Sequence, residues 1–173
     1  MKKPYDLYVD YDGVCVSFYE ATKEILGGNW DSPKWGTPEK REERAAIIRG
    51  KDGFWKNMPP ERDFRELWNF IKPFDPSILT AYPEWDKEGA IKGKWEWNEK
   101  WTKVPHNKFH CVERASKKYF AKSHDGSHYG KPNLLIDDFP QNIREFETAG
   151  GVGILHKSAA ETINTLKKLG YSH

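Results

Sequence analysis

The sequence has few cysteines and no long hydrophobic run. Only Cys15 and Cys111 are present among 173 residues, which is too few for the disulfide framework of a small secreted domain. No apolar run approaches the roughly 18 residues that suggest a membrane span. Met1 to Pro4 leads into an apolar segment without the hydrophobic region of a signal peptide. We therefore expect reduced cysteines and a cytoplasmic protein that has no membrane partner.

An excess of charge of one sign is also missing. The formal net charge is +2, so the chain as a whole gives no reason to expect a polyanion as its partner. Hydrophobic residues make up 37% of the chain, and eight Trp, eight Tyr and nine Phe supply much of the apolar volume. This composition and length indicate one globular domain, with room for a small appended lobe.

The segment from Tyr5 to Val9 is apolar and is followed by two acidic residues and a glycine. It predicts a short buried strand that ends in Asp10, Tyr11, Asp12 and Gly13. Side chains two apart in an extended segment point the same way, so Asp10 and Asp12 are expected side by side. Like charges that close need a cation or a shared proton. Asp-Gly is also common turn chemistry, and this stretch alone leaves both interpretations open.

A second apolar run, Asn133 to Ile136, also ends in an acidic pair, Asp137 and Asp138. In a parallel sheet the carboxyl ends of all strands lie on one edge, so up to four carboxylates would converge there. Left uncompensated, such a cluster would cost several kcal/mol. Mg²⁺ is a hard cation that binds carboxylates, water and phosphate, and it would remove this cost.

Helical and strand patterns alternate through the rest of the chain. Such alternation predicts right-handed crossovers and an α/β fold, in which a Rossmann-like parallel sheet has helices on both faces. Residues 14–58 contain helices and loops and form an insertion after the first strand, so the core is expected at 1–13 and 59–173. The expected strands are 5–9, 77–81, 108–113, 133–138 and 151–155, and the expected helices are 17–26, 37–49, 64–71, part of 84–101, 114–121, 141–149 and 158–169.

Other polar residues are candidates for the same edge of the sheet. Thr80 ends the strand expected at 77–81 and offers a hydroxyl and the backbone N–H groups that follow it. A basic set precedes the fourth strand, and one of its members is expected to reach the carboxylates and phosphate. This set comprises Arg114, Lys117, Lys118 and Lys122. His124 and His128 flank Asp-Gly-Ser, which favours solvated loop histidines over a zinc site.

These motifs together resemble the haloacid dehalogenase (HAD) superfamily of phosphotransferases. They occur in the family's order as DYDGV, SILTA, a lysine near 117 and LLIDD. Within that superfamily the chain resembles the 5′(3′)-deoxyribonucleotidase type, on the basis of Val14, Phe54-Trp55 before Met58-Pro59-Pro60, and Lys94-x-x-Trp97. Polynucleotide 3′-phosphatases share the four motifs. The stretch before LLIDD is longer than expected, so we choose Lys117 and leave Lys118 and Lys122 open.

The resemblance implies a HAD-like core, a small helical cap at 14–58 and a role for each motif. Asp10 would attack phosphorus and form an aspartyl-phosphate, and Asp12 would act as general acid and base. Asp10, the backbone carbonyl of Asp12, and Asp137 would hold Mg²⁺, while Asp138 would hold a metal-bound water or a neighbouring ligand. The remaining phosphoryl oxygens would be bound by Thr80, the backbone of Ala81, and Lys117.

The cap would cover the site, and four of its aromatic residues are candidates for stacking on a base. These are Trp30, Trp35, Phe54 and Trp55. For any single tryptophan the favoured alternative is a place in the cap's own small core, and at least one is expected to face the site. The chain is expected to hydrolyse phosphomonoesters, with (deoxy)nucleoside monophosphates as the first choice of substrate.

Two alternatives to a nucleotidase stay open. The first is a phosphatase of nucleic-acid ends, which the local lysines 117, 118, 122 and 131 favour and the near-neutral charge disfavours. The second is a phosphate-binding module that does not hydrolyse, although such proteins would more often lack Asp12 or the acids of LLIDD. The sequence leaves the oligomeric state undetermined.

Overall fold

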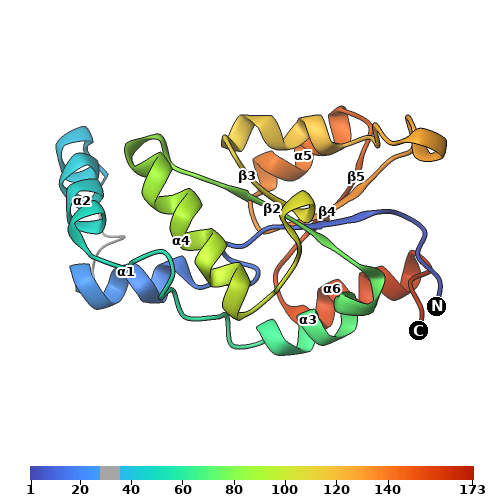
Figure 1. Cartoon of the computed structure of the whole chain (residues 1–173), viewed down its shortest axis with the longest axis horizontal. Helices are drawn as coiled ribbons and strands as arrows, with labels where there is room; N and C mark the ends of the chain where they lie inside the picture. The colour runs from blue at the N-terminus through green and yellow to red at the C-terminus, as the bar shows by residue number, and fades with distance from the viewer. Residues whose placement is uncertain (28–35) are drawn as a thin grey trace.

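The computed structural model describes residues 1–27 and 36–173 and places their strands in one parallel sheet (Figure 1). The strand order is β3-β2-β1-β4-β5, so β1 lies at the centre between β2 and β4. The expected α/β fold is therefore confirmed. Trp30 and Trp35 lie outside the described residues. The strands are β1 Leu7–Val9, β2 Ser77–Ala81, β3 Phe109–Val112, β4 Leu134–Asp137 and β5 Val152–Leu155.

Helices cover both faces of the sheet, as the alternating pattern predicts. Below the sheet in Figure 1 lie α3 (Phe64–Ile71) and α6 (Ala159–Lys168), and above it lies α5 (Pro140–Thr148) with the 3₁₀ helix η5 (Arg114–Phe120). The remaining α-helices are α1 (Phe18–Leu26), α2 (Pro38–Gly50) and α4 (Lys87–Lys100). No helix in the described part of the chain is long and apolar enough to cross a membrane.

Alternate residues of the central strands enter two separate hydrophobic clusters. Leu134 and Ile136 of β4 belong to the larger cluster, whereas Leu135 between them packs with Ile143 and Phe146 of α5. Side chains alternate across a strand, and here both faces are buried. This is why the strands appear in the sequence as continuous apolar runs rather than as an alternation with polar residues.

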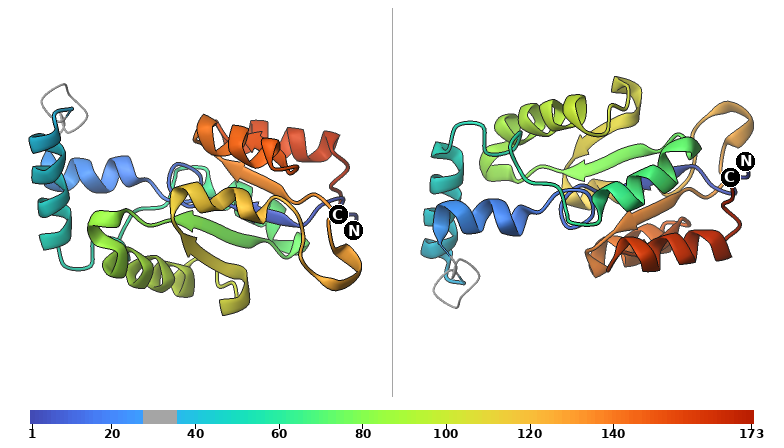
Figure 2. Two further views of the ribbon diagram at one scale, coloured as in Figure 1. Left: turned by 90° about the horizontal axis from the view of Figure 1, so that it is seen from above. Right: turned by 90° about the horizontal axis from the view of Figure 1, so that it is seen from below.

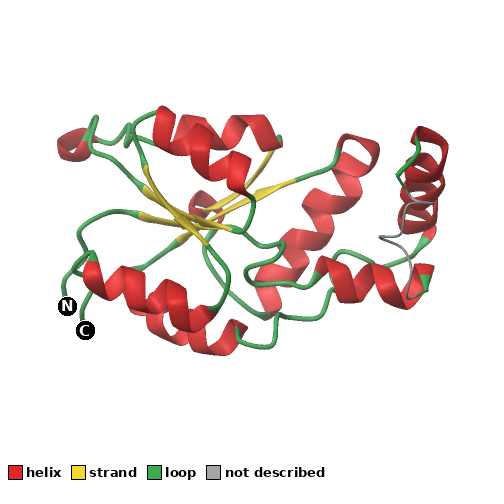
Figure 3. Cartoon of the chain, turned by 180° about the vertical axis from the view of Figure 1, so that it is seen from behind, coloured by secondary structure: helices red, strands yellow, loops and turns green. Residues whose placement is uncertain are grey.

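Helices α1 and α2 lie beyond the carboxyl ends of the central strands (Figures 1 and 2). Ser17 and Thr37 accept hydrogen bonds from backbone N–H groups of their first turns, as N-cap residues do. In the view from behind, both helices stand apart from the sheet (Figure 3). Phe54 and Trp55, however, belong to the same hydrophobic cluster as Phe64. A separate cap that ends at residue 58 stays a prediction.

Helix α4 runs through two glycines that weaken the helical pattern in the sequence. Gly93 is buried, and a Cβ at this position would clash with the Cβ of Trp55 and crowd the backbone N of Lys56. The glycine therefore lets the segment before residue 59 pack closely on the helix. The conformational cost of glycine in a helix is offset here by a tertiary contact.

Gly93→Ala is expected to destabilise the protein by about 1–3 kcal/mol, because the new methyl group overpacks this contact. Gly50→Ala, in helix α2, is the matched control because no atom lies within 4 Å of a Cβ built there. The control should change the free energy of unfolding by no more than about 1 kcal/mol, in the stabilising direction. Urea denaturation of both variants measures the difference, and equal stability of the two would contradict the proposed close contact.

Candidate active site

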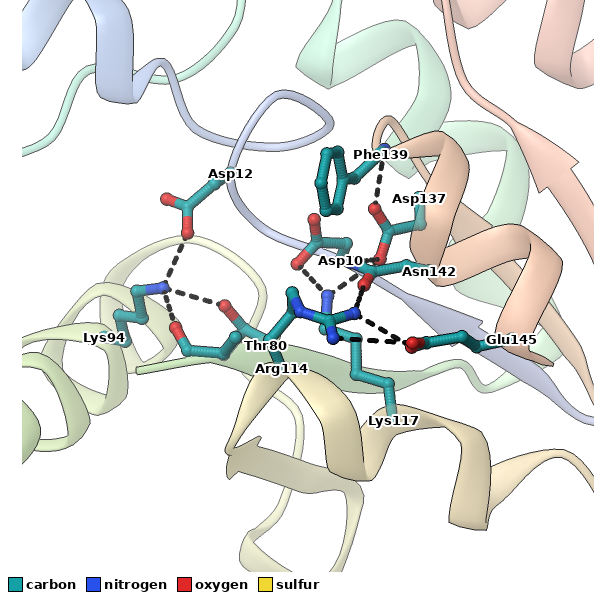
Figure 4. A network of polar contacts seen from close by, with 11 residues as sticks. Asp10, Asp12, Thr80, Lys94, Arg114, Lys117, Asp137, Phe139, Asn142 and Glu145 are labelled. Carbon is teal, nitrogen blue, oxygen red and sulfur yellow. Dashed lines mark hydrogen bonds and ion pairs between the residues drawn. The ribbon is translucent and has the colours of Figure 1, made fainter. Parts of the chain in front are cut away.

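Pairing of β1 with β4 brings Asp10 and Asp137 together. Val9 is in register with Ile136, and the backbone N–H of Asp10 donates to the Ile136 carbonyl at 3.0 Å. The Nζ atom of Lys117 lies between the two carboxylates, 2.9 Å from Asp10 Oδ1 and 2.8 Å from Asp137 Oδ2 (Figure 4). The tips of the first and fourth strands therefore meet, and one ammonium bridges them.

The 3₁₀ helix η5 carries Lys117 to this position. It follows β3 directly and packs against α5, which follows β4. Lys117 is buried, whereas Lys118 is half-buried and Lys122 is exposed. Of the three lysines that the sequence left open, Lys117 is the one that the structure joins to Asp10.

Burial and like charge shift the pKa values of these groups. Burial and the charge of Asp137 hold the pKa of Asp10 well above its ordinary value, against the opposing effect of Lys117. Burial alone would lower the pKa of Lys117, but the charges of Asp10 and Asp137 raise it above that of a free lysine. Burial and the charge of Asp137 raise the pKa of Asp138 to about 6.

Polar partners on α5 and η5 fix the orientation of Asp137. Its Oδ1 accepts from the backbone N–H of Phe139 at 2.9 Å, and its Oδ2 accepts from Asn142 Nδ2 at 3.0 Å. Arg114 in turn donates to Asn142 Oδ1 at 3.0 Å and forms an ion pair with Glu145 at 2.8 Å. These contacts leave Asp137 little freedom to rotate (Figure 4). Arg114 and Asn142 were not expected in these positions from the sequence.

Three carboxylates form a group that could hold a metal ion, and this acidic group consists of Asp10, Asp137 and Asp138. One oxygen from each lies within 4.8 Å of the others. Lys117 supplies a single positive charge to three carboxylates. When all three are ionised, a divalent cation would bring the net charge of the group to zero. Oxygen donors of this kind suit Mg²⁺. His124 and His128, both exposed, are not part of the group.

Gly13 explains why a glycine follows Asp12. Its φ of +79° lies in the left-handed region, and a Cβ at this position would clash with the carboxylate of Asp138. The loop after β1 therefore passes close to the acidic group only because this residue lacks a side chain.

The side chain of Asp12 has a different partner from Asp10. Its Oδ2 accepts from Lys94 Nζ at 2.7 Å, and Figure 4 shows the two aspartates pointing to different partners. The expectation of neighbouring Asp10 and Asp12 carboxylates fails because the strand ends at Val9. A tight turn follows, in which the Tyr11 carbonyl accepts three backbone N–H groups, and this turn redirects the chain.

Lys94 is a further residue of the site, and the sequence analysis gave it no role there. It comes from α4, is buried, and donates to Thr80 Oγ1 at 3.0 Å and to the Ala81 carbonyl at 2.6 Å. A lysine ammonium can only donate, so Thr80 accepts from it, and no residue among 1–27 and 36–173 accepts from the O–H of Thr80. The Lys94-x-x-Trp97 motif in the sequence was the available signal, although it does not indicate this contact.

Two adjoining cavities open on these groups. The inner cavity, of about 630 Å³, is lined by Asp10, Asp12, Ala81, Lys117 and Asp138 among others. The aromatic cavity, of about 270 Å³, is lined by Asp12, Phe18, Trp55, Tyr82, Trp85 and Lys94 among others. Of the expected stacking residues, Trp55 lines the aromatic cavity, whereas Phe54 packs edge-on against Trp55 behind it. Asp12 lies on the wall of both cavities.

The fold is similar to that of solved HAD-type hydrolases. A hydrolase from Streptococcus pneumoniae TIGR4 is 15% identical with a TM-score of 0.54, over 96% of this chain and 100% of that one. A HAD-superfamily hydrolase from Ehrlichia chaffeensis is 12% identical with a TM-score of 0.51, over 98% of each chain. The HAD-hydrolase YfnB from Bacillus subtilis, solved bound to magnesium, is 15% identical with a TM-score of 0.57, over 96% of this chain and 100% of that one.

These likenesses show that the chain has a Rossmann-like HAD fold. No protein-family model matches the sequence, and no curated protein matches it.

Lys117→Met is expected to lower the free energy of unfolding by about 3–5 kcal/mol at neutral pH, because it leaves buried carboxylates without a cation. The folded-state pKa of Asp10 already lies above its unfolded value and should rise further in this variant. The folded chain then binds more protons than the unfolded chain, so the variant gains stability as the pH falls. The loss in free energy of unfolding should therefore be smaller at about pH 5 than at about pH 8.

Urea denaturation in the presence of a chelator, at both pH values, measures how much the loss in free energy of unfolding decreases. Lys118→Met is the matched control, because Lys118 is half-buried and makes no ion pair with the acidic group. A loss of the same size at both pH values would contradict the proposed balance of charges.

Proposed function

We propose that the protein is a Mg²⁺-dependent phosphomonoester hydrolase that acts through an aspartyl-phosphate on Asp10. One observation carries the proposal: Lys117 bridges Asp10 and Asp137 beside Asp138, at the carboxyl edge of a HAD-like sheet. A static ion pair would need neither a third carboxylate nor the inner cavity into which these groups open. A phosphoryl group needs a nucleophile, cationic donors and a metal, and the site offers a candidate for each.

In the first step Asp10 attacks phosphorus, and the bond from phosphorus to the ester oxygen breaks. Lys117 uses two of its three N–H donors on Asp10 and Asp137, so the third is available to a phosphoryl oxygen. The free O–H of Thr80 is a second donor, and the backbone at Ala81 borders the inner cavity. Asp12 donates a proton to the leaving alkoxide.

In the second step Asp12 takes a proton from a water molecule that attacks the aspartyl-phosphate. The bond from phosphorus to Asp10 breaks, and inorganic phosphate leaves while the Asp10 carboxylate is restored. General acid–base help of this kind is typically about 10² to 10⁴-fold in rate. The position of Asp12 on the wall of both cavities suits both transfers.

Asp10, the Asp12 backbone carbonyl and Asp137 would hold Mg²⁺, with Asp138 as a further carboxylate ligand or as a partner of metal-bound water. When bound, the ion would offset the negative charge that gathers on the transferring group. Asn142 and Arg114 hold Asp137 in one orientation, which is the usual task of residues behind metal ligands.

A nucleoside monophosphate is the substrate that this site suits best. The aromatic cavity adjoins Asp12, so it lies where the leaving group of the ester would sit. Phe18 and Trp55 on its wall are stacked, and such faces contribute about 1–3 kcal/mol per base in single-strand binders. Nucleic-acid ends are a weaker candidate, because Lys117, one of the four lysines that favour them, is buried between Asp10 and Asp137 and offers its remaining donor inside the site rather than to a backbone phosphate.

The first test is a phosphatase screen with Mg²⁺ over mononucleotides, sugar phosphates and phosphorylated oligonucleotides. We expect 5′-nucleoside monophosphates to be hydrolysed, with little dependence on salt. Asp10→Asn should lower turnover by about 10³-fold or more while the circular dichroism spectrum stays unchanged, because the nucleophile is lost. Near wild-type turnover in this variant would refute the role of Asp10.

The same screen separates the alternatives. Preferred hydrolysis of oligonucleotide ends, with an affinity that falls steeply as salt increases, would identify a phosphatase of nucleic-acid ends. Phosphate binding without turnover of any ester would identify a binding module.

Removal of the metal is the second test. EDTA followed by dialysis should abolish hydrolysis, and added Mg²⁺ should restore it, because the acidic group needs a divalent cation to accept another anion. Titration calorimetry of the chelated protein should detect Mg²⁺ binding that Asp137→Asn weakens. Full activity in the chelator would exclude a metal-dependent mechanism.

A further inference from the structure

Lys94 is completely buried, at 0% exposure, yet it carries a charged side chain. Its Nζ atom has three acceptors: Asp12 Oδ2 at 2.7 Å, Thr80 Oγ1 at 3.0 Å and the Ala81 carbonyl at 2.6 Å. An ammonium has three N–H donors, so every one of them is used. Lys94 therefore has no donor left for a substrate, in contrast to Lys117.

The consequence falls on the carboxylate of Asp12. Lys94 fixes Oδ2, while Oδ1 is buried and has no hydrogen-bond partner among residues 1–27 and 36–173. A buried polar atom without a partner is costly and rare in folded proteins. Because Oδ1 is buried while the Asp12 side chain as a whole is 35% exposed, the part of Asp12 that lines the inner and aromatic cavities is the side that carries Oδ2, the oxygen that Lys94 holds.

A purely structural role explains these contacts less well. A buried ion pair is weak evidence for stability, because desolvation offsets much of the attraction between the charges. Lys94 also links three parts of the site, namely the loop after β1, the end of β2 and the Trp55 ring 5.4 Å from its Nζ. Each of these parts borders the aromatic cavity, where the leaving group would sit.

We infer that Lys94 is a positioning residue that clamps Asp12 Oδ2 and so holds the Asp12 carboxylate in the orientation that faces the ester oxygen of the leaving group. The inference rests on the proposed function. As the bond from phosphorus to the ester oxygen breaks, the proton on Asp12 passes to that oxygen and the alcohol departs. Without the clamp, the carboxylate of Asp12 turns freely and meets the leaving oxygen less often.

Lys94→Met tests this inference with two esters. An alkyl phosphate releases a weakly acidic alcohol that needs a proton, whereas p-nitrophenyl phosphate releases an acidic phenol that does not. We expect kcat for the alkyl phosphate to fall about 10²-fold, because general acid help is worth at least that much. The kcat for p-nitrophenyl phosphate should fall less than about 5-fold by the same reasoning. Lys94→Met also removes the contact with Thr80, which would bind the phosphoryl group. Any change in KM from that cause should be the same for both esters, because both carry the same phosphoryl group.

Asp12→Asn supplies the reference, because it should show the same preference for the good leaving group. The double variant should be no more selective than Asp12→Asn alone, since the two residues act as one unit. Asn98→Ala is the matched control on α4: Asn98 is buried and bonded to Thr102 and Val104 rather than to Asp12. It should lower the melting temperature and leave the ratio of the two kcat values unchanged.

Three results would overturn the inference. Equal losses on the two esters, or losses in the double variant that multiply, would reject Lys94 as a positioning residue and leave the proposed function standing. Absence of turnover of either ester by the unaltered protein would reject both. Thermal unfolding establishes whether Lys94→Met is folded, and Lys94→Leu, which also lacks an N–H donor, replaces it in the same comparison if it is not.

Discussion

Repulsion between buried carboxylates at the ends of β1 and β4 is the constraint on which the rest of the structure depends. Asp10 and Asp137 come together because their strands are parallel neighbours, and burial together with the charge of Asp137 makes ionisation of Asp10 costly without a cation. Lys117 supplies one, and η5 is the element that delivers it. The position of η5 between β3 and β4 therefore follows from the charge at the sheet edge as well as from its packing on α5.

Much of this arrangement could be predicted from the sequence, because it depends on patterns that act over short distances. Parallel strands that are buried on both faces appear as continuous apolar runs, and the runs before Asp10 and Asp137 are of this kind. Alternation with helices then places their carboxyl ends on one edge. The meeting of Asp10, Asp137 and Asp138 follows from these two facts and needs no knowledge of side-chain orientation.

The orientation of Asp12 and the role of Lys94 could not be predicted in this way. The rule that residues two apart point the same way holds only inside a strand, and β1 ends at Val9. The turn that follows needs Gly13 at a positive φ and directs Asp12 toward α4. Lys94 reaches this point from within a helix, through a long flexible side chain. Its signal in the sequence, the Lys94-x-x-Trp97 motif, does not indicate this contact.

The two buried lysines differ in one respect that bears on function. Lys94 has given all three donors to the protein, so it can hold Asp12 and Thr80 in place but has none to offer a ligand. Lys117 has given two and retains one at the inner cavity. A network that only stabilised the fold would gain by satisfying both lysines completely. The donor of Lys117 that no residue among 1–27 and 36–173 accepts from is therefore the feature that most favours the proposed binding of an anion at the inner cavity.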